Sequence, residues 1–349
     1  MNKHKQIEGL VDRLSSKKGS CKGVSLVDTT RNIDLMTCEP MKKLGEGKFG
    51  KVFLLKCDGE EYVVKKICSK YILNKDVDYN KYSQEFFDDQ TKFAKKYPNF
   101  VKPDLTKLEK EIMKEITSLE LLSGLELSPK VYDSWICKTS EKPCGYIVME
   151  KYDMTLNDFI YECIKYYYLK DDVDGAINSI KKLDKIIKEL ANKKKIEKIT
   201  VGDIHQHNVM IKFKDSNKKH LFKPDNIVDI RHIDLGFGAY REDDDRRLQN
   251  NINAVGNIFK GYRIWSRLLT YSSEPKFIKF VDNVLEECLD LNYPDLLKQY
   301  RSWYNTNKEY VEMEEEDEII IKAINKLYPE APKKVVKRRV YYDSDSDSD

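Results

Sequence analysis

The sequence predicts an α+β fold in which a small lobe built on an antiparallel sheet precedes a larger helical lobe. Short apolar runs broken by turn residues occupy positions 41–149, and helical periodicity dominates after them. Hydrophobic residues make up 40% of the 349, which is enough to bury a core of this size. We therefore expect four parts: an N-terminal extension (1–40), a small lobe (41–149), a large lobe (150–325) and a flexible charged tail (326–349).

The small lobe begins with a pair of strands. Apolar runs at Lys51–Lys56 and Glu61–Cys68 are separated by an Asp-Gly dipeptide, which is typical of a tight hairpin turn. Two further strand-like runs, Val131–Cys137 and Tyr146–Met149, flank another turn, rich in Lys, Pro and Gly. These four runs predict the antiparallel sheet.

Helices are predicted where apolar residues recur at helical spacing. An insertion at about 69–104 shows no clear periodicity, and a helix follows at Leu105–Leu122. Its apolar positions are Leu108, Ile112, Ile116, Leu119 and Leu122. In the large lobe the same pattern predicts helices that include Ile177–Leu190 and Ile252–Tyr262.

The composition argues against several classes of protein. The chain has 62 Lys plus Arg against 59 Asp plus Glu, so we expect no nucleic-acid binding driven by bulk charge. No apolar run approaches the ~20 residues of a membrane span, and the first ten residues are polar and basic, unlike a signal peptide. The eight cysteines form no CxxC pair, which favours reduced thiols. We therefore expect a soluble, cytoplasmic protein.

The strongest local motif is Gly-Glu-Gly-Lys-Phe-Gly-Lys-Val at positions 45–52. Glycines such as Gly45, Gly47 and Gly50 let the backbone approach phosphate oxygens, because a side chain would occupy the place of the anion. The same spacing occurs in dinucleotide-binding folds, where it opens a helix; here Val52 begins an apolar run typical of a strand. A glycine-rich hairpin without a ligand is the structural alternative.

Lys65 ends an apolar strand, Tyr62–Lys65, and an unpaired ammonium on a buried strand costs several kcal/mol. It therefore needs an anionic partner. At about 100° per residue, Glu115 falls inside the apolar stripe of the following helix, and Glu111 lies at its edge. We expect Glu115 to pair with Lys65, with Glu111 as the second choice. The alternative is that Glu115 only extends past the margin of the stripe.

Two polar motifs follow in the large lobe. Asp203 precedes Asn208 by five residues, and an apolar strand comes next. Asp234 then opens an Asp-Leu-Gly tripeptide. The order and the spacing match the catalytic loop and the Asp-Phe-Gly element of kinases, with Leu in place of Phe.

With these motifs in this order, the chain resembles the eukaryotic-type protein kinases over about residues 41–270. The resemblance implies a two-lobed kinase fold that binds ATP between the lobes beneath the glycine motif. It implies transfer of the γ-phosphate of ATP, with Mg²⁺, to a Ser/Thr hydroxyl of protein substrates. By the same resemblance, Lys65 would hold the α and β phosphates, Glu115 would orient Lys65, Asp203 would accept the hydroxyl proton, and Asn208 and Asp234 would bind magnesium.

The resemblance also implies where the adenine binds. Val148–Tyr152 looks like the hinge, with Met149 behind the adenine and backbone groups of Glu150 and Tyr152 along its hydrogen-bonding edge. Met210 would lie against the base. The implied nucleotide-binding residues are Gly45, Gly47, Gly50, Val52, Lys65, Met149, Glu150, Tyr152 and Met210.

The chain departs from the family pattern at three places. Val201-Gly202 replaces the His-Arg before Asp203, and because that arginine pairs with a phosphorylated activation loop, we expect activity not to be switched in that way. No Ala-Pro-Glu follows Asp234, so the activation segment is short, and Asn251 replaces the aspartate that anchors the catalytic loop. These features are similar to kinases of large DNA viruses, for which the location would be host cytoplasm or virion.

Three alternatives stay open. His205 completes an Asp-x-His-x-x-Asn pattern similar to that of aminoglycoside and choline-type phosphotransferases, which act on small molecules. A nucleotide-binding pseudokinase scaffold is a second alternative, which the retained catalytic residues disfavour. His205 and His207 form a pair that a metallohydrolase would use for zinc, although nothing else in the sequence supports zinc. The expected partner is a protein substrate, and the sequence leaves the oligomeric state open.

Overall fold

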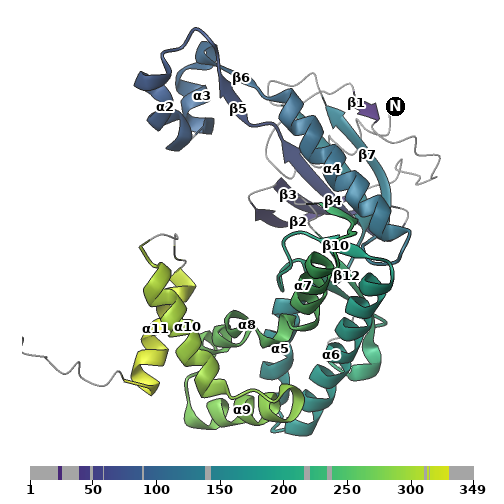
Figure 1. The fold of residues 1–349 in the computed structure, drawn as a ribbon, viewed down its shortest axis with the longest axis vertical. Helices are drawn as coiled ribbons and strands as arrows, with labels where there is room; N and C mark the ends of the chain where they lie inside the picture. Colours follow the sequence, from purple (N-terminus) through teal and green to yellow (C-terminus); the bar gives the residue numbers. More distant parts are fainter. Residues whose placement is uncertain are drawn as a thin grey trace, which may run out of the picture.

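A computed structural model of the chain describes residues 23–25, 39–47, 50–57, 59–88, 90–137, 143–215, 221–233, 238–309, 313 and 315–329. The fold is α+β, as predicted: an antiparallel sheet in the N-terminal part is followed by a mainly helical C-terminal part (Figure 1). One hydrophobic cluster runs from the inner face of the sheet into the helices, because it includes Ile147 of the sheet as well as Leu183 and Trp265.

The main sheet has six strands in the order β1-β7-β8-β4-β3-β2, and every neighbouring pair is antiparallel. The strands are β1 (Gly23–Ser25), β2 (Glu39–Gly47), β3 (Gly50–Cys57), β4 (Glu60–Cys68), β7 (Val131–Cys137) and β8 (Cys144–Glu150). The predicted hairpin is confirmed as β3 and β4, and the second predicted pair as β7 and β8. β1 lies within the expected extension 1–40, and it adds a strand to the sheet beside β7.

Helix α4 (Leu105–Ser123) packs on the sheet, and the predicted apolar stripe is confirmed because all five of its residues are buried. The side chain of Asp104 caps the helix by accepting a hydrogen bond from the backbone N–H of Lys107. The helix is followed by Gly124. Glu115 and Ser118 are the polar side chains buried along it.

The insertion is folded, although its sequence shows no clear periodicity. It contains β5 (Tyr71–Leu73), α2 (Tyr79–Asp88), α3 (Gln90–Lys96), the 3₁₀ turn Pro98–Phe100 and β6 (Val101–Pro103). Phe86, Phe93 and Val101 form its small core, surrounded by further aromatic rings in edge-to-face contact. It lies beyond the N-terminal end of α4 (Figure 1).

The C-terminal part is built from helices with short strands between them. The strands are β9 (Met154–Thr155), β10 (Ile199–Val201), β11 (Val209–Phe213), β12 (Ile227–His232) and β13 (Ala239–Arg241). The α-helices are α5 (Leu156–Tyr168), α6 (Val173–Ile196), α7 (Asp245–Gly256), α8 (Tyr262–Ser266), α9 (Pro275–Leu289), α10 (Tyr293–Asn307) and α11 (Glu315–Leu327). Three 3₁₀ turns, Pro224–Asn226, Ile258–Lys260 and Arg267–Thr270, complete it.

Two sequence predictions for this part have different outcomes. The helix predicted around Ile177–Leu190 is confirmed as α6. The single helix predicted over Ile252–Tyr262 is wrong in extent: α7 ends at Gly256, and α8 starts only at Tyr262. The backbone angles of Asn257 and Gly261 are not α-helical, and a 3₁₀ turn lies between these two residues. The apolar residues that looked like one stripe therefore belong to two α-helices and a turn.

The described chain continues to Pro329, so α11 extends past the boundary at 325 that the sequence suggested. Most of the tail and most of the N-terminal extension lie outside the described residues. Within the described ranges, no helix is both long enough and apolar enough to cross a membrane.

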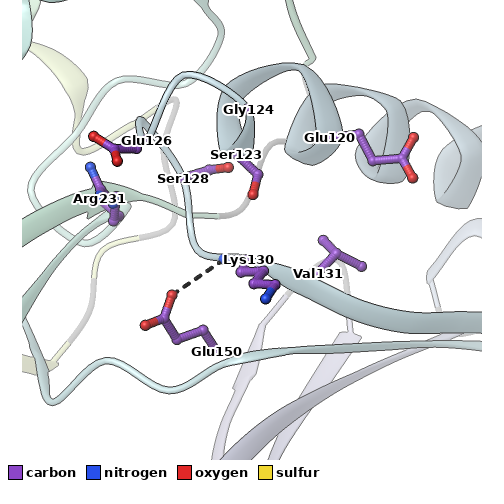
Figure 2. A pocket seen from close by; sticks show the side chains of 9 residues that line it. All are labelled: Glu120, Ser123, Gly124, Glu126, Ser128, Lys130, Val131, Glu150 and Arg231. Atoms are coloured by element: carbon purple, nitrogen blue, oxygen red, sulfur yellow. Dashed lines mark hydrogen bonds between the residues drawn. The ribbon is translucent and has the colours of Figure 1, made fainter. Parts of the chain in front are cut away.

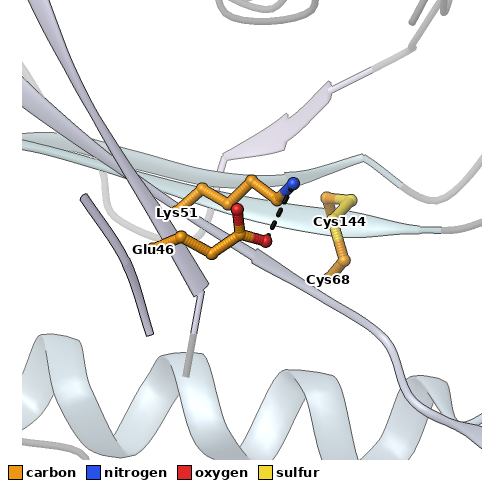
Figure 3. Close-up of a disulfide and its surroundings, with 4 residues drawn as sticks. All are labelled: Glu46, Lys51, Cys68 and Cys144. Atoms are coloured by element: carbon orange, nitrogen blue, oxygen red, sulfur yellow. Dashed lines mark ion pairs between the residues drawn. A yellow bond between two sulfur atoms is a disulfide. The ribbon is translucent and has the colours of Figure 1, made fainter. Parts of the chain in front are cut away.

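The expectation of reduced cysteines is wrong. Cys68 and Cys144 form a disulfide between β4 and β8, where the two residues are directly opposite in register (Figure 3). Cys57 and Cys137 are also disulfide-bonded, whereas Cys163 and Cys288 carry free thiols. Strand register, not sequence spacing, brings Cys68 to Cys144, so a search for CxxC pairs could not find it. The argument for a cytoplasmic location from cysteine usage no longer holds, because disulfides persist mainly in oxidising compartments.

Candidate active site

The centre of the candidate site is a buried ion pair. Lys65 Nζ of β4 lies 2.7 Å from Glu115 Oε1 and 2.9 Å from Glu115 Oε2 of α4. The two residues are 6% and 2% exposed, so both charges are almost completely removed from water. The predicted pair is confirmed with Glu115, and not with the second choice, Glu111, which is half-buried.

The alternation of side chains along β4 explains the orientation of Lys65. Lys65 faces α4, and the next residue, Lys66, faces the other side of the sheet, where its ammonium lies 5.5 Å from the ring centroid of Tyr146. A buried ammonium is tolerated when a carboxylate accepts its hydrogen bonds in good geometry. The paired charges are thus held at a fixed place under the sheet.

The glycine motif forms the end of the β2–β3 hairpin, with Gly45 opposite Val52 and Gly47 opposite Gly50. The motif therefore leads into a strand, as predicted, and does not open a helix as in dinucleotide-binding folds. Glu46 forms an ion pair with Lys51 at 2.9 Å (Figure 3) and another with Lys43. Hydrogen bonds from Lys43 and then from Lys51 lower the pKa of Glu46 to about 2.

Gly50 is the glycine that the fold requires. Its φ is +150°, and a Cβ at this position would lie 2.3 Å from the carbonyl oxygen of Lys66 on β4. A side chain would therefore clash with the backbone of the neighbouring strand. Gly45 has no atom within 4 Å of the place of its Cβ, so packing does not require a glycine there. Lys48 and Phe49 of the motif lie outside the described residues.

The segment between β10 and β11 brings Asp203 and Asn208 together. Asn208 Nδ2 donates to the carbonyl oxygen of Asp203 at 3.1 Å and to Asp203 Oδ2 at 3.3 Å. Asp203 has a left-handed backbone, φ +56°, which turns the chain toward Asn208. His205 Nε2 lies 3.5 Å from Asp203 Oδ2. The structure thus places Asn208, which the sequence singled out by its spacing, in direct contact with Asp203.

Asp234, the second predicted metal ligand, lies outside the described residues. The described chain before it ends at Ile233, whose backbone N–H donates to the carbonyl oxygen of Asn208 at 2.9 Å. Among the described residues, no group of three or more His, Cys, Asp or Glu side chains is placed to hold a metal ion. The rings of His205 and His207 are 5.8 Å apart.

Helix α4 also contacts the C-terminal part of the site. The backbone N–H of Ala239 on β13 donates to Ser118 Oγ at 2.9 Å, and the N–H of Gly202 donates to the carbonyl oxygen of Gly238 at 2.9 Å. β13 pairs in turn with β10, which leads directly to Asp203. The helix that carries Glu115 is therefore connected through β13 to the segment that carries Asp203.

The segment from Met149 to Tyr152 connects the sheet with the helical part. Met149 is buried in β8, opposite Val63 of β4. The backbone N–H of Glu150 donates to the carbonyl oxygen of Lys130 at 2.9 Å. Met210 is half-buried on β11, opposite Thr155.

Ion pairs hold this connection on both sides. Lys151 Nζ lies 2.6 Å from Glu61 Oε2 of β4, and Lys212 Nζ of β11 lies 2.6 Å from Glu150 Oε1. The hydroxyl of Tyr152 donates to Asp229 Oδ2 at 2.6 Å. Burial, and then this hydrogen bond, raise the pKa of Tyr152. The connection thus has fixed partners in the sheet and in the helical part.

A cavity of about 480 Å³ lies beside this connection (Figure 2). It is lined by the end of α4, the loop to β7, and single residues of β7, β8 and β12: Glu120, Ser123, Gly124, Glu126, Ser128, Lys130, Val131, Glu150 and Arg231. Lys65, Glu115, Asp203 and Asn208 do not line it. This cavity is therefore distinct from the site of the buried ion pair.

Sequence reasoning missed another buried lysine, on α6. Lys194 of α6 is 0% exposed, and its Nζ has no hydrogen-bond partner; the same holds for Nε2 of the buried His232 on β12. Burial lowers the pKa of Lys194 to about 7, and burial followed by the charge of Lys194 holds the pKa of His232 well below its usual range. The signal was present, since Lys194 follows Leu190 by four residues in the apolar stripe of α6.

Comparison with known proteins adds no assignment. A scan against models of protein families and a search of curated proteins found no match.

Proposed function

We propose that this protein is a two-lobed, kinase-like phosphotransferase that transfers the γ-phosphate of ATP, with Mg²⁺, to Ser/Thr hydroxyls of protein substrates. The observation that carries the proposal is the buried Lys65–Glu115 pair. Such a pair contributes little to stability compared with apolar residues of the same volume. It is therefore best explained by a need for a fixed positive charge, as in binding the phosphates of a nucleotide.

The order of the elements supports the same proposal. An antiparallel sheet is packed against one long helix, α4, and a short connection at Glu150–Asp153 leads into the helical part. The glycine hairpin belongs to the sheet: it joins the edge strand β2 to β3, and β3 pairs with β4, the strand of Lys65. In this arrangement the hairpin would cover phosphates that Lys65 binds from below, and Gly47 at the end of the hairpin would leave room for their oxygens.

The roles of the remaining residues follow from their chemistry. Asp203 would accept the proton of the attacking hydroxyl, and Asn208 and Asp234 would hold magnesium, which neutralises charge on the transferred phosphoryl group. The contacts of Asn208 fit this role, because its amide nitrogen is directed at Asp203 and its amide oxygen is left for a hard cation. Catalysis would then depend on alignment, with the reacting groups held by fixed partners.

For the adenine we propose the buried side of the connection. Met149 would lie behind the base and Met210 against its face, while backbone groups of Glu150 and Tyr152 would hydrogen-bond its edge. The ion pairs of Glu150 and Lys151 support this assignment, because they hold the backbone of this segment in one position.

The proposal is tested with one enzyme preparation, Mg²⁺ and γ-labelled ATP, offered generic Ser/Thr-containing proteins and, separately, small alcohols and amino sugars. Transfer to protein is expected, with loss of about 10²-fold or more in Lys65→Met and in Asp203→Asn. Lys66→Met is the matched control, because its ammonium faces the other side of β4. Wild-type rates in Lys65→Met or in Asp203→Asn, or no transfer to any acceptor, would contradict the proposal.

A small-molecule phosphotransferase is the second candidate function. His205 favours it, because its Nε2 lies 3.5 Å from Asp203 Oδ2, where it is placed to interact with a small acceptor. Transfer to an amino sugar or alcohol with none to protein would select this candidate. ATP binding without any transfer would instead indicate a pseudokinase scaffold.

A further inference from the structure

Ser118 lies at the contact between the two parts of the candidate site. It follows Glu115 by three residues, about one helical turn, on α4 and is 3% exposed. Its hydroxyl donates to the carbonyl oxygen of Lys114 at 2.7 Å and accepts from the backbone N–H of Ala239 at 2.9 Å. Because the hydroxyl is almost closed off from water, loss of this acceptor would leave the N–H of Ala239 without an equivalent partner.

The contact continues to Asp203 through the backbone. Ala239 pairs with Val201 across β13 and β10, and the carbonyl oxygen of Gly238 accepts from the N–H of Gly202 at 2.9 Å. Asp203 is the next residue. A row of hydrogen bonds therefore joins the helix turn of Glu115 to the residue beside Asp203.

Gly238 makes this close approach possible. Its φ is +88°, and a Cβ there would lie 2.8 Å from Cε of Lys114 and 3.6 Å from Ser118 Oγ. The left-handed φ favours glycine at this position, and a side chain there would also displace the end of the Lys114 side chain.

We propose that Ser118 is a positioning residue that fixes α4, and with it Glu115 and Lys65, relative to Asp203. This inference rests on the proposed phosphotransferase function. Gly202 stands where the resembled kinases carry an arginine that pairs with a phosphorylated loop. Here the backbone N–H of Gly202 instead donates to the carbonyl oxygen of Gly238, beside the residue that bonds Ser118. The position of α4 is therefore set by Ser118 without phosphorylation.

The test compares Ser118→Ala with Ser128→Ala. Ser128 is a matched control, because it is also buried and its hydroxyl donates to the carbonyl oxygen of Leu119 on the same helix, at 3.0 Å, without contact to β13. Ser118→Ala is expected to lower kcat/KM for ATP about tenfold, with a raised KM for ATP and an unchanged KM for the acceptor. Ser128→Ala should leave kcat/KM and KM for ATP at their wild-type values. Ser118→Thr, which retains the hydroxyl, should have most of the wild-type kcat/KM for ATP.

Hydrogen exchange at the amide of Ala239 gives a readout that does not depend on activity. It should accelerate about tenfold or more in Ser118→Ala and stay at the wild-type rate in Ser128→Ala. If Ser118→Ala does not fold, Ser118→Cys, which is similar in size but a weaker acceptor, gives the same comparison.

The outcomes separate this inference from the proposed function. An inactive wild-type protein overturns both. An active wild-type protein with equal ATP constants in Ser118→Ala and Ser128→Ala overturns the role of Ser118 alone, and so does unchanged exchange at Ala239.

Discussion

Asn251 of α7 holds Val201 of β10 with both ends of its amide. Its Oδ1 accepts from the backbone N–H of Val201 at 3.1 Å, and its Nδ2 donates to the carbonyl oxygen of the same residue at 2.8 Å. From the sequence, Asn251 looked like the loss of an anchoring aspartate. The amide instead makes two bonds to the strand that leads to Asp203, of which a carboxylate could make only one.

The first prediction concerns the reverse change, Asn251→Asp. A carboxylate would keep the bond from the N–H of Val201 but would face its carbonyl oxygen, so we expect a loss of about 1–3 kcal/mol in the free energy of unfolding. Urea denaturation measures it. Asn253→Asp on the same helix is the control, because Asn253 is exposed and its side-chain oxygen accepts a hydrogen bond from the side chain of Gln249. Equal stability of the two variants would show that the amide donor of Asn251 does not matter.

The second prediction separates two glycines of the same motif. Gly50→Ala should lower the free energy of unfolding by about 1–3 kcal/mol and weaken ATP binding, because its Cβ would meet the carbonyl oxygen of Lys66. Gly45→Ala should leave stability within about 0.5 kcal/mol of the wild type, since nothing lies near its Cβ. Thermal unfolding and nucleotide titration measure both. Similar stability losses in the two variants would contradict the hairpin geometry described for β2 and β3.

The third prediction concerns pH and the buried Lys194. Its pKa of about 7 lies below its ordinary value of 10.5, so between these pH values the unfolded chain binds more protons than the folded one. The free energy of unfolding contributed by Lys194 therefore rises with pH, by up to about 1.4 kcal/mol per pH unit, from pH 7 toward 10.5. Lys194→Met should be more stable than the wild type at pH 7, and this gain should shrink as the pH rises to 10.

The control for this titration is Lys193→Met. Lys193 neighbours Lys194 on α6, but its side chain is 42% exposed and pairs with Glu126. The difference in stability between wild type and Lys193→Met should vary little over the same pH range. If the free energies of unfolding of the wild type and Lys194→Met changed in parallel with pH, Lys194 would not be buried as a free amine.

The fourth prediction concerns the disulfide between Cys68 and Cys144. Its removal in Cys68→Ser with Cys144→Ser should lower the free energy of unfolding by about 2–4 kcal/mol, because the link closes a long loop of 76 residues. Peptide mapping under non-reducing conditions should recover the linked pair. Cys288→Ser, which removes a free thiol, should leave stability near that of the wild type. Recovery of both cysteines as free thiols in the native protein would contradict the link.

What could be predicted from the sequence depends on how local the signal is. Helical spacing and the cost of a buried charge were enough to choose Glu115 over Glu111 for Lys65. The same two rules also identify Lys194 in the stripe of α6, but it has no partner, so no motif drew attention to it. The five-residue spacing drew attention to Asp203 and Asn208, and their contact is local because a short turn can join residues so near in sequence.

The features that could not be predicted depend on contacts between distant elements. Cys68 meets Cys144 only because the register of β4 and β8 places them opposite each other. The helices of the insertion are stabilised by ring contacts such as Phe86 with Phe93, which leave no regular apolar period. The link from Ser118 to Ala239 joins residues 121 positions apart, and no local pattern indicates it.

The bond between Cys68 and Cys144 also spans the whole insertion, since every residue from 69 to 143 lies between its two ends. A protease that cuts once within the insertion, at 69–104, would leave two fragments linked by this disulfide. On a gel without reductant the nicked molecule would migrate as one band, and the ammonium of Lys65 would stay beside the carboxylate of Glu115 although the peptide chain between them was broken.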